Sequence, residues 1–441
     1  MRIVLKNFRL VDEETDMNGA LIIDDGVISA ALPSAEKAED AAFVIDGRGL
    51  SPGGLPVLMP AFVDLHAHFR DPGFPEKETI ESASLAAAAG GFCTVVCMAN
   101  TRPVIDTVEK VRRLENRSGA LGLVDLYPVM SLSAGMEGSE LSGITALAPG
   151  EGPLMLSEDG KDMASDDLFL AAMKEAKRLG VPISCHCDFG ADENNAVRRA
   201  IELGMKAGCH IHIAHVSAGE AVETIRQAKA AVKAAAKTAA SGIGSGFVLT
   251  CEAMPHNLCL TEEDAAKLGA DTWGRVNPPL RSERDRMALI RALADGTVDA
   301  VATDHAPHSA EDKERGAPGF SGFETAFAAV YTELVRSVPR NGAGSGGTAT
   351  GVISLKYLSS LMSARPARLL GLGDGARNGA RKRGRLLPGY RADLVIVDTE
   401  SSRIAEPAAF KTRGKNTPFA GKELFGTILM TMKEGRFTFM L

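Results

Sequence analysis

Residues 57–68 read VLMPAFVDLHAH, and this stretch decides the fold. The segment Val57–His66 is a short apolar run that ends in a pair of histidines. Such runs, alternating with helical patterns, are typical of a parallel sheet built from βα units. Seven more follow along the chain, at Phe92–Ala99, Val124–Val129, Pro153–Ser157, Val181–Cys187, His210–His215, Phe247–Cys251 and Val298–Thr303.

Helical patterns lie between these runs, at Thr79–Ala89, Asp166–Leu179, Ala191–Ala207, Gly219–Lys237 and Glu283–Ala294. Eight successive βα units favour a closed barrel over an open doubly wound sheet. We therefore predict an α/β protein built on a (β/α)8 TIM-type barrel that spans residues 54–387.

The two ends of the chain have a different pattern. Residues 1–53 contain short strand-like runs separated by turns, and the tail beyond Leu387 contains more of them. Chain termini lie close together in many domains. We expect residues 1–53 and 388–441 to form one small composite β-sandwich domain beside the barrel.

Charge and composition exclude several classes of protein. The formal net charge of −7 offers no basic stripe for phosphates, so a nucleic-acid partner is not expected. No run of about 18 apolar residues is present, so we expect no membrane span. The N-terminal residues lack the pattern of a secretory signal. Seven scattered cysteines fit reduced thiols in the cytoplasm better than a disulfide framework.

Candidate metal ligands fall at the ends of the predicted strands. His66 and His68 are two residues apart at the end of the first strand. An isolated pair of this kind is more often satisfied by hydrogen bonds, but other candidates follow later strands. Because barrel strands meet at their carboxyl ends, we expect one metal site there, formed by His66, His68, Asp159, His186, His215 and Asp304.

The remaining histidines are interpreted differently. His210 and His212 have the opposite strand parity from His215, so we expect them to point away from it and to be structural. His256 stays open, and His305 is a candidate for orienting the ligands from behind. Cys185 and Cys187 flank His186, but a thiolate site is disfavoured because no second cysteine pair has suitable spacing.

Nitrogen and carboxylate ligands without thiolates suit Zn²⁺. We expect one or two zinc ions per chain, with two favoured and bridged by Asp159 and a hydroxide. Asp304 would orient the attacking water, take its proton and return that proton to a departing amide nitrogen. The chemistry expected is therefore amide hydrolysis without a serine or cysteine nucleophile.

Motifs along nearly the whole chain resemble those of the dihydroorotases. They include MPAFVDLHAHFRDPG, GFCTVVCMANTRP, LSEDG, HIAHVS, CEAMPHN, RVNPPLRSERDR, VATDHAPHSAEDK, GFETAFAAVYTELV, LLPGYRADLVIVD and NTPFAGKELFGTI. This resemblance implies zinc-dependent, reversible hydrolysis of (S)-dihydroorotate to N-carbamoyl-L-aspartate in pyrimidine (UMP) synthesis. It also implies a cytoplasmic homodimer and allows a complex with aspartate transcarbamoylase.

The resemblance also assigns roles to individual residues. His66 and His68 match the paired ligands, Asp159 the bridging carboxylate, His186 and His215 the later ligands, and Asp304 the catalytic acid and base. It implies that substrate is contacted by Arg70, Asn100, Asn277, His308 and Gly322. Arg70 and Asn100 would hold the substrate carboxylate, which suits a bidentate guanidinium. The alternative for Arg70 is an ordinary surface ion pair.

Two departures from the family pattern concern the metal site. Glu158 stands where an aspartate is usual, and the segment between His186 and His215 is shorter than in most relatives, which would reshape one rim of the pocket. Relatives with a carboxylated lysine carry it on the fourth strand, whereas Lys161 here falls beyond the turn at Gly160. Hydantoinases and allantoinases are therefore less similar than the aspartate-bridged type.

Two other functions are possible for a chain with this pattern. Another cyclic-amide hydrolase, of hydantoinase or allantoinase type, would leave Arg70 without a partner. A non-catalytic partner of aspartate transcarbamoylase would be expected to have lost metal ligands, which this chain retains.

Residues Ala306–Gly322, rich in Gly and Pro, are predicted to form a mobile lid over bound substrate.

Overall fold

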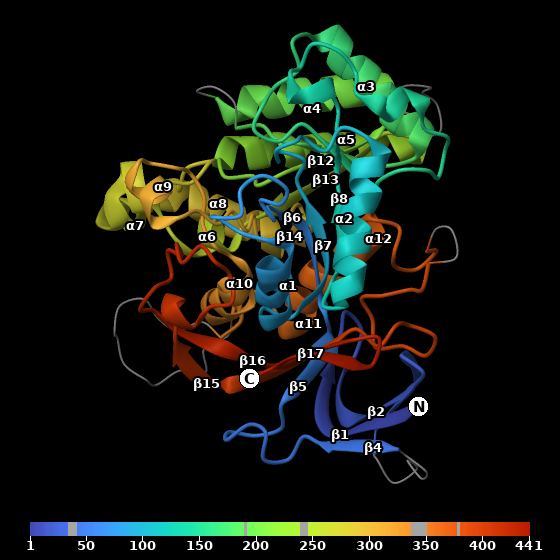
Figure 1. The fold of residues 1–441 in the computed structure, drawn as a ribbon, viewed down its shortest axis with the longest axis vertical. Helices are drawn as coiled ribbons and strands as arrows, with labels where there is room; N and C mark the ends of the chain where they lie inside the picture. Colours follow the sequence, from blue (N-terminus) through green and yellow to red (C-terminus); the bar gives the residue numbers. More distant parts are fainter. Residues whose placement is uncertain (34–41, 189–191, 239–245, 337–350, 377–379) are drawn as a thin grey trace.

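The computed structural model describes residues 1–33, 42–188, 192–238, 246–336, 351–376 and 380–441. A barrel of parallel strands with helices outside it lies beside a mixed sheet formed by the two ends of the chain (Figure 1). The predicted α/β fold is therefore confirmed. None of the described helices is long and apolar enough to cross a membrane.

The barrel strands follow one another in chain order and all neighbours are parallel. They are β6 (Phe62–Ala67), β7 (Phe92–Cys97), β8 (Asp125–Pro128), β9 (Met130–Ser131), β10 (Leu156–Ser157), β11 (Ile183–Cys185), β12 (His210–Ile213), β13 (Val248–Ala253) and β14 (Ala300–Val301). Only Val129 separates β8 from β9, so the two form one barrel position. A parallel bridge between Ala67 and His305 joins the last position to the first, and each of the eight predicted runs contributes a strand.

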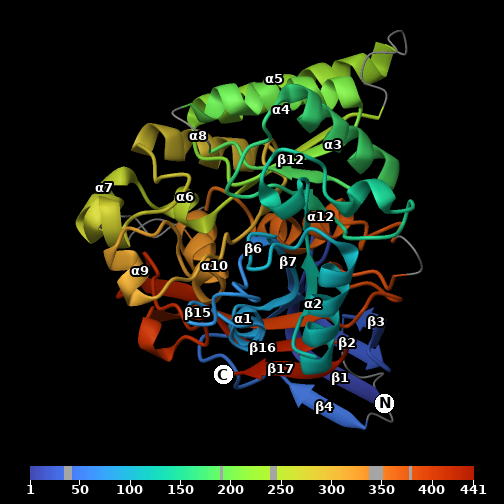
Figure 2. The same cartoon turned by 45° about the horizontal axis from the view of Figure 1, so that its top comes forward.

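Helices cover the outside of the barrel, as the second view shows (Figure 2). They are α1 (Ile80–Ala89), α2 (Val108–Leu121), α3 (Asp166–Leu179), α4 (Glu193–Ala207), α5 (Gly219–Thr238), α6 (Pro255–Cys259), α7 (Glu262–Leu268), α8 (Glu283–Ala294), α9 (Ala310–Glu314), α10 (Phe323–Val330), α11 (Leu355–Ser359) and α12 (Arg365–Leu369). The predicted start of the fourth helix at Ala191 lies outside the described residues. In the structure α4 begins at Glu193, because the side chain of Asp192 caps the amide of Asn195.

The chain ends form one sheet in the order β17-β16-β15-β5-β1-β2-β3, with β4 also paired to β1. Its strands are β1 (Arg2–Val11), β2 (Asp16–Asp24), β3 (Val27–Leu32), β4 (Phe43–Asp46), β5 (Val57–Pro60), β15 (Leu394–Ile404), β16 (Glu423–Lys433) and β17 (Arg436–Met440). Interpreting Val57–His66 as a single barrel strand was therefore wrong. Proline has no N–H for a ladder, and the strand ends at Pro60 before the chain enters the barrel at Phe62.

The two faces of the terminal sheet pack on different cores. Along β15, Leu394 and Ile396 face a small core within the sheet, while Val395 and Val397 face the barrel core. The small core also contains Ile28 of β3, from near the far end of the strand order, so the sheet curls around it as a sandwich would. The division of the chain at residues 53 and 388 remains a prediction.

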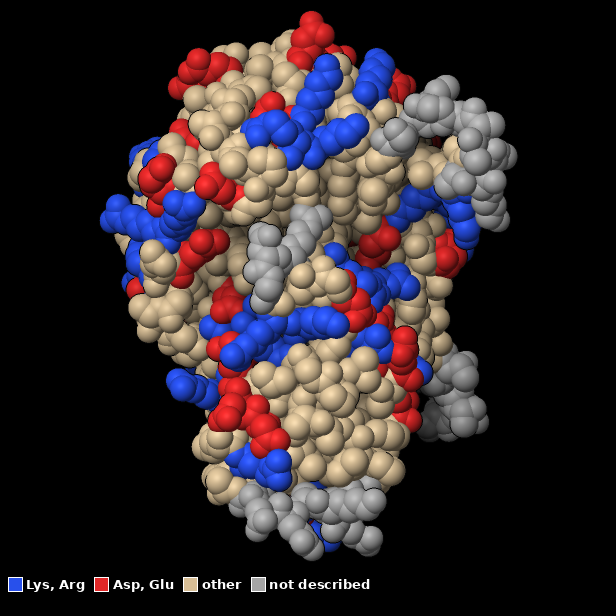
Figure 3. Space-filling model, turned by 90° about the vertical axis from the view of Figure 1, so that its right-hand side faces the viewer, with Lys and Arg blue, Asp and Glu red and all other residues tan. Residues whose placement is uncertain are grey.

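On the face that Figure 3 shows, Lys and Arg side chains are mixed with Asp and Glu. The expectation that nucleic acid is not a partner stays a prediction. All seven cysteines are free and buried, as expected from the absence of a disulfide framework.

Candidate metal centre

The six predicted ligands converge at the carboxyl ends of the barrel strands. His66 lies on β6 and His68 just beyond it, and the others follow β10, β11, β12 and β14 in turn. All six side chains are buried. The convergence that the strand assignment predicted is therefore present in the structure.

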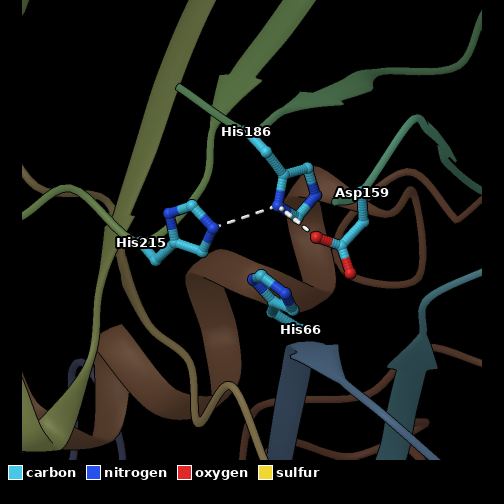
Figure 4. A group of neighbouring side chains, drawn as sticks. All are labelled: His66, Asp159, His186 and His215. Carbon is cyan, nitrogen blue, oxygen red and sulfur yellow. Dashed lines mark hydrogen bonds and ion pairs between the residues drawn. The ribbon is translucent and has the colours of Figure 1, made fainter. Parts of the chain in front are cut away.

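One group of ligands contains His66, Asp159, His186 and His215 (Figure 4). Nδ1 of His186 lies 3.0 Å from Oδ1 of Asp159 and 3.0 Å from Nε2 of His215. The ring of His66 faces this pair, with its centroid 4.9 Å from that of His186. One ligand atom from each of the four residues falls within 4.8 Å of the others. This spacing brings four donor atoms around one point.

A second group shares His66 and adds His68 and Asp304. Oδ1 of Asp304 lies 3.2 Å from Nε2 of His68 and 3.5 Å from Nε2 of His66. Oδ2 of Asp159 lies 3.5 Å from Nε2 of His68, so Asp159 borders both groups. The structure therefore brings together two adjoining groups of side chains, each of which could hold a metal ion, with Asp159 next to both.

The residues present fit a metal ion on two counts. Nε2 of His66 is buried and has no hydrogen-bond partner among the described residues, although it belongs to both groups. Burial raises the pKa of Asp159, but His186 and His68 outweigh it and hold that pKa well below its usual range. The same balance lowers the pKa of Asp304, beside His66 and His68. Buried ionised carboxylates need a positive partner, which a metal ion between these residues would supply. A mixture of nitrogen and oxygen donors suits zinc.

Backbone strain aims two of these side chains. His215 and Asp304 have left-handed φ angles of 32° and 44°, which residues other than glycine rarely adopt. His215 therefore departs from the alternation of β12. The expectation that His212 points away from this region was wrong for this reason: its Nε2 lies 3.1 Å from Oε2 of Glu252, which also contacts His66 and His215. Among the described residues His212 belongs to neither group of candidate ligands, as expected.

Glu252 on β13 contacts the candidate ligands and was not predicted from the sequence. Its Oε1 lies 3.0 Å from Nδ1 of His66 and accepts from the amide of His215 at 3.4 Å. Carboxylates behind ligating histidines fix the tautomer and raise ligand basicity. The signal was available in CEAMPHN, because Glu252 directly follows the predicted strand Phe247–Cys251 and is one more carboxylate at a strand end.

Asn100 lies behind two of the ligands. Its Nδ2 donates to Oδ2 of Asp159 at 2.8 Å, and its Oδ1 lies 3.0 Å from Nδ1 of His68. Both ends of the amide are therefore engaged with the metal centre. Asn100 therefore lies at the candidate centre, and its predicted contact with a substrate carboxylate stays a prediction.

Arg70 and His308 meet at the edge of the centre. Nη2 of Arg70 lies 3.2 Å from Nε2 of His308, and Nε of Arg70 donates to the carbonyl of Pro307 at 3.3 Å. Among the described residues, no carboxylate forms an ion pair with Arg70, which is only partly exposed. The surface ion pair considered as the alternative for Arg70 is therefore not found there.

The other two predicted substrate contacts are engaged within the protein. Nδ2 of the exposed Asn277 donates to Oδ2 of Asp188, which follows β11. The amide of Gly322 donates to Nδ1 of His305 at 3.1 Å, so it turns toward that ring. A Cβ at Gly322 would lie 3.0 Å from the carbonyl oxygen of Thr303, which gives this glycine a packing role.

His305 and His256 are not among the ligands. The ring of His305 stacks on Phe323, with centroids 4.1 Å apart, and its carbonyl accepts from the amide of His68 at 2.7 Å. His305 thus supports His68 through the main chain and not through its imidazole. The ring of His256 packs edge-on against Phe320, and burial lowers its pKa to about 4.

The thiolate alternative receives no support. The sulfurs of Cys185 and Cys187 lie 3.8 Å from backbone carbonyl oxygens, and neither belongs to a ligand group of the described residues. Burial raises the pKa of both thiols, which favours the neutral form. Both cysteines are therefore core residues.

Glu158, the departure from the family pattern, is accommodated by the neighbouring strand end. Its carboxylate accepts from the amides of Leu132 and Ser133 at 2.9 and 3.0 Å and from the Ser133 hydroxyl. It therefore ties the ends of two strands together and leaves Asp159 in the ligand group. The shortened segment between His186 and His215 includes residues 189–191, which lie outside the described residues.

The predicted lid, Ala306–Gly322, contains the short helix α9 and is fastened at several points. The amide of Ala306 donates to the carbonyl of Phe320 at 2.7 Å, and the amide of His308 donates to Oδ1 of Asn416 at 3.0 Å. Nδ2 of Asn416 in turn donates to the carbonyl of Gly319 at 2.9 Å. A segment of the C-terminal part of the chain thus supports this loop from outside.

Comparison with known proteins identifies the family of this chain. Residues 57–438 match the model of the amidohydrolase family. The chain therefore belongs to the amidohydrolase family.

Curated relatives narrow the family further. The chain is 35% identical over 444 residues to a dihydroorotase of Clostridium botulinum, with 99% of each chain covered. It is 36% identical over 465 residues to a dihydroorotase of a Geobacillus strain, covering 99% of this chain and 98% of the relative. These relatives place it among the dihydroorotases.

The solved structures that it resembles include an L-hydantoinase (dihydropyrimidinase) from Arthrobacter aurescens. The TM-score is 0.80 at 25% sequence identity, with 99% of this chain and 95% of the hydantoinase covered. A D-hydantoinase structure has a TM-score of 0.79 at 22% identity, which shows a shared fold. The predicted barrel with an attached sheet domain is thus the architecture of known cyclic-amide hydrolases.

Proposed function

We propose that this chain is a zinc-dependent dihydroorotase. It would open the ring of (S)-dihydroorotate to N-carbamoyl-L-aspartate and close it in the reverse direction, as a step of pyrimidine (UMP) synthesis. The observation that carries the proposal is the convergence of six buried side chains in two adjoining groups, formed by His66, His68, Asp159, His186, His215 and Asp304. The dihydroorotase relatives, matched over nearly the full chain, support the choice of substrate.

Two zinc ions are favoured because the ligands form two adjoining groups. His66 would lie at the junction, and Asp159 would bridge the two positions. When bound, zinc would lower the pKa of a water molecule and polarise the carbonyl that is attacked. Ser157, whose hydroxyl lies 2.9 Å from Nε2 of His186, would hold that ring so that Nδ1 faces the centre.

Asp304 would move the proton. Its carboxylate faces the centre beside His66 and His68, and its low pKa keeps it ionised and able to accept. It would take the proton of the attacking water and deliver it to the ring nitrogen as the C–N bond breaks. In ring closure the same carboxylate would remove a proton from that nitrogen.

Arg70 would bind the substrate carboxylate. It lacks an anionic partner among the described residues and lies beside the ring of His308. Burial, together with the charges of Arg70 and Lys77, lowers the pKa of His308 to about 3, so this ring is neutral. A guanidinium held in this way is suited to a carboxylate ligand. This observation favours dihydroorotate over hydantoin or allantoin, which have no carboxylate for Arg70 to bind. Asn277 at the rim would complete the pocket.

Assembly and location follow from the family resemblance. We propose a homodimer in the cytoplasm, and the seven free, buried cysteines support a reducing compartment. A complex with aspartate transcarbamoylase remains the alternative assembly. Sedimentation of the purified chain, alone and with that enzyme, would separate the two.

The test is ring-opening activity on L-dihydroorotate before and after chelation, with zinc readded and with hydantoin and allantoin alongside. Activity on dihydroorotate alone that zinc restores would support both substrate and metal. Activity on hydantoin instead would favour the second candidate, which the shared hydantoinase fold supports. A zinc-loaded chain without activity on any of the three would contradict the proposal and favour the non-catalytic partner.

A further inference from the structure

Lys313 in helix α9 is a cation in an unusual position. Its side chain has no exposed surface, and among the described residues it has no carboxylate partner. Its Nζ instead donates to three main-chain carbonyls, those of Arg275 at 2.8 Å, Ala317 at 2.9 Å and Gly319 at 3.0 Å. The ammonium has three donors, so this cage uses all of them.

The ring of Phe320 also contacts the Lys313 ammonium, which is shielded from solvent. Nζ of Lys313 lies 5.2 Å from the centroid of Phe320, which is within the range of a cation–π contact. Burial, together with Arg275, lowers the pKa of Lys313 to about 8, so the group is still mostly protonated at neutral pH. Burying a charge is costly unless hydrogen bonds replace those lost from water. The three carbonyls supply these bonds and are themselves held in place by the ammonium.

The carbonyls that Lys313 binds belong to two segments that lie next to predicted substrate-binding residues. Arg275 is two residues from Asn277, and α9 packs against the turn Gly269–Trp273 that precedes it, beside α7 (Figure 1 and Figure 2). Ala317 and Gly319 lie on either side of Pro318, whose own carbonyl is 2.8 Å from Nε2 of His308. Lys313 therefore connects the Asn277 segment with the peptide units that face His308.

The packing around His308 leaves little room for displacement. Gly319 has a φ of 136°, and a Cβ there would lie 2.7 Å from the carbonyl oxygen of Ala306 and 3.3 Å from Cδ2 of His308. In the tautomer that carries the proton on Nε2, His308 donates to the Pro318 carbonyl and its Nδ1 faces Nζ of Lys77, 3.5 Å away. Nη2 of Arg70, 3.2 Å from the same Nε2, then packs against the ring without a hydrogen bond to it. A shift of the 317–319 peptide units would turn the ring away from Arg70.

We propose that Lys313 is a positioning residue for substrate binding: its buried ammonium fixes the peptide units around Pro318 and so holds His308 beside Arg70. This inference rests on the proposed function, in which Arg70 and His308 receive the substrate carboxylate. Lys313 does not touch the metal ligands or the reacting atoms. Its loss should therefore weaken substrate binding and leave the metal centre intact.

The experiment is a double-mutant cycle between K313M and H308A. Methionine matches the length of the lysine stem but donates no hydrogen bond, so the three carbonyls lose their partner. We expect K313M to raise KM for dihydroorotate about tenfold while kcat stays within about twofold. In the H308A background K313M should change KM little further, because the effect passes through His308. Zinc content should stay at the wild-type value.

The matched control is K177M, which removes a lysine that donates to the carbonyl of Ala207 at 3.2 Å between α3 and α4. It should leave both kinetic constants unchanged. Additive effects of K313M and H308A, or an unchanged KM in K313M, would overturn the inference. If K313M does not fold, K313Q is put through the same cycle with the same criteria. Absence of ring-opening activity in the wild-type chain would instead contradict the proposed function.

Discussion

Oε1 of Glu252 lies 3.0 Å from Nδ1 of His66, and Oε2 of the same carboxylate lies 3.1 Å from Nε2 of His212. Burial would raise the pKa of Glu252, but the two histidines outweigh it and hold that pKa below its usual range. With Nδ1 of His66 engaged in this way, Nε2 is left facing the ligand group. Glu252 thus selects the ring nitrogen that is free to bind metal.

Replacing Glu252 by glutamine should weaken zinc binding. The amide keeps an acceptor for His66 but loses the charge that makes the imidazole a stronger ligand, so we expect about 10-fold to 100-fold lower affinity. Competition with a chromophoric chelator would measure it. E175Q, at an exposed pair with Arg178, is the control. Equal zinc affinity in wild type and E252Q would show that Glu252 serves packing only.

Asp304→Asn should separate metal binding from proton transfer. The asparagine retains an oxygen beside His68 but cannot carry the proton, so kcat for ring opening should fall by about 10²-fold to 10⁴-fold. Zinc content by elemental analysis should change far less than kcat. If D304N kept more than half of the wild-type kcat with zinc bound, another group would have to be the acid and base.

Much of this fold was predictable because barrel strands are buried on both faces and give continuous apolar runs. The predictions failed where a single residue changes the direction of the chain. Pro60 divides the first run between two sheets, and the left-handed φ of His215 breaks the alternation that would have placed His212. Neither change interrupts the apolar pattern from which the strands were predicted.

The candidate site was predictable to the extent that its residues follow strand ends. Glu252 was missed because its partner His66 is 186 positions away in the sequence, and only barrel closure brings them together. The same holds for Asn416, which supports His308 from the C-terminal segment. The substrate role of Asn100 stays a prediction, and the sequence could not show that its amide contacts Asp159 and His68.

Arg70→Gln should impair recognition of the substrate carboxylate. Hydrogen bonds to charged groups contribute about 1.5–3 kcal/mol, so we expect KM for dihydroorotate to rise about 10-fold to 100-fold. R70K keeps the charge without the bidentate fork and should have an intermediate KM. Dihydrouracil, the same ring without the carboxylate, is the matched substrate. A similar loss on both substrates would show that Arg70 maintains the loop and does not bind the carboxylate.

Asp125→Asn should destabilise the junction between the barrel and the terminal sheet. Asp125 on β8 meets Arg383 at 2.8 Å, Arg391 at 2.7 Å and Lys433 at 2.7 Å, and these cations come from the C-terminal part of the chain. Burial alone would raise the pKa of Asp125, but the three cations lower it to about 2. Since the folded pKa is below the ordinary value, the stabilisation is present above about pH 4 and is lost as pH falls toward 2.

We expect D125N to lower the free energy of unfolding by about 3 kcal/mol at pH 7 and by less at pH 3, as measured by urea unfolding. D24N, at the exposed pair with Arg2, should cost less than about 1 kcal/mol. An equal loss in both variants, or one that does not shrink with falling pH, would contradict a charge-mediated junction.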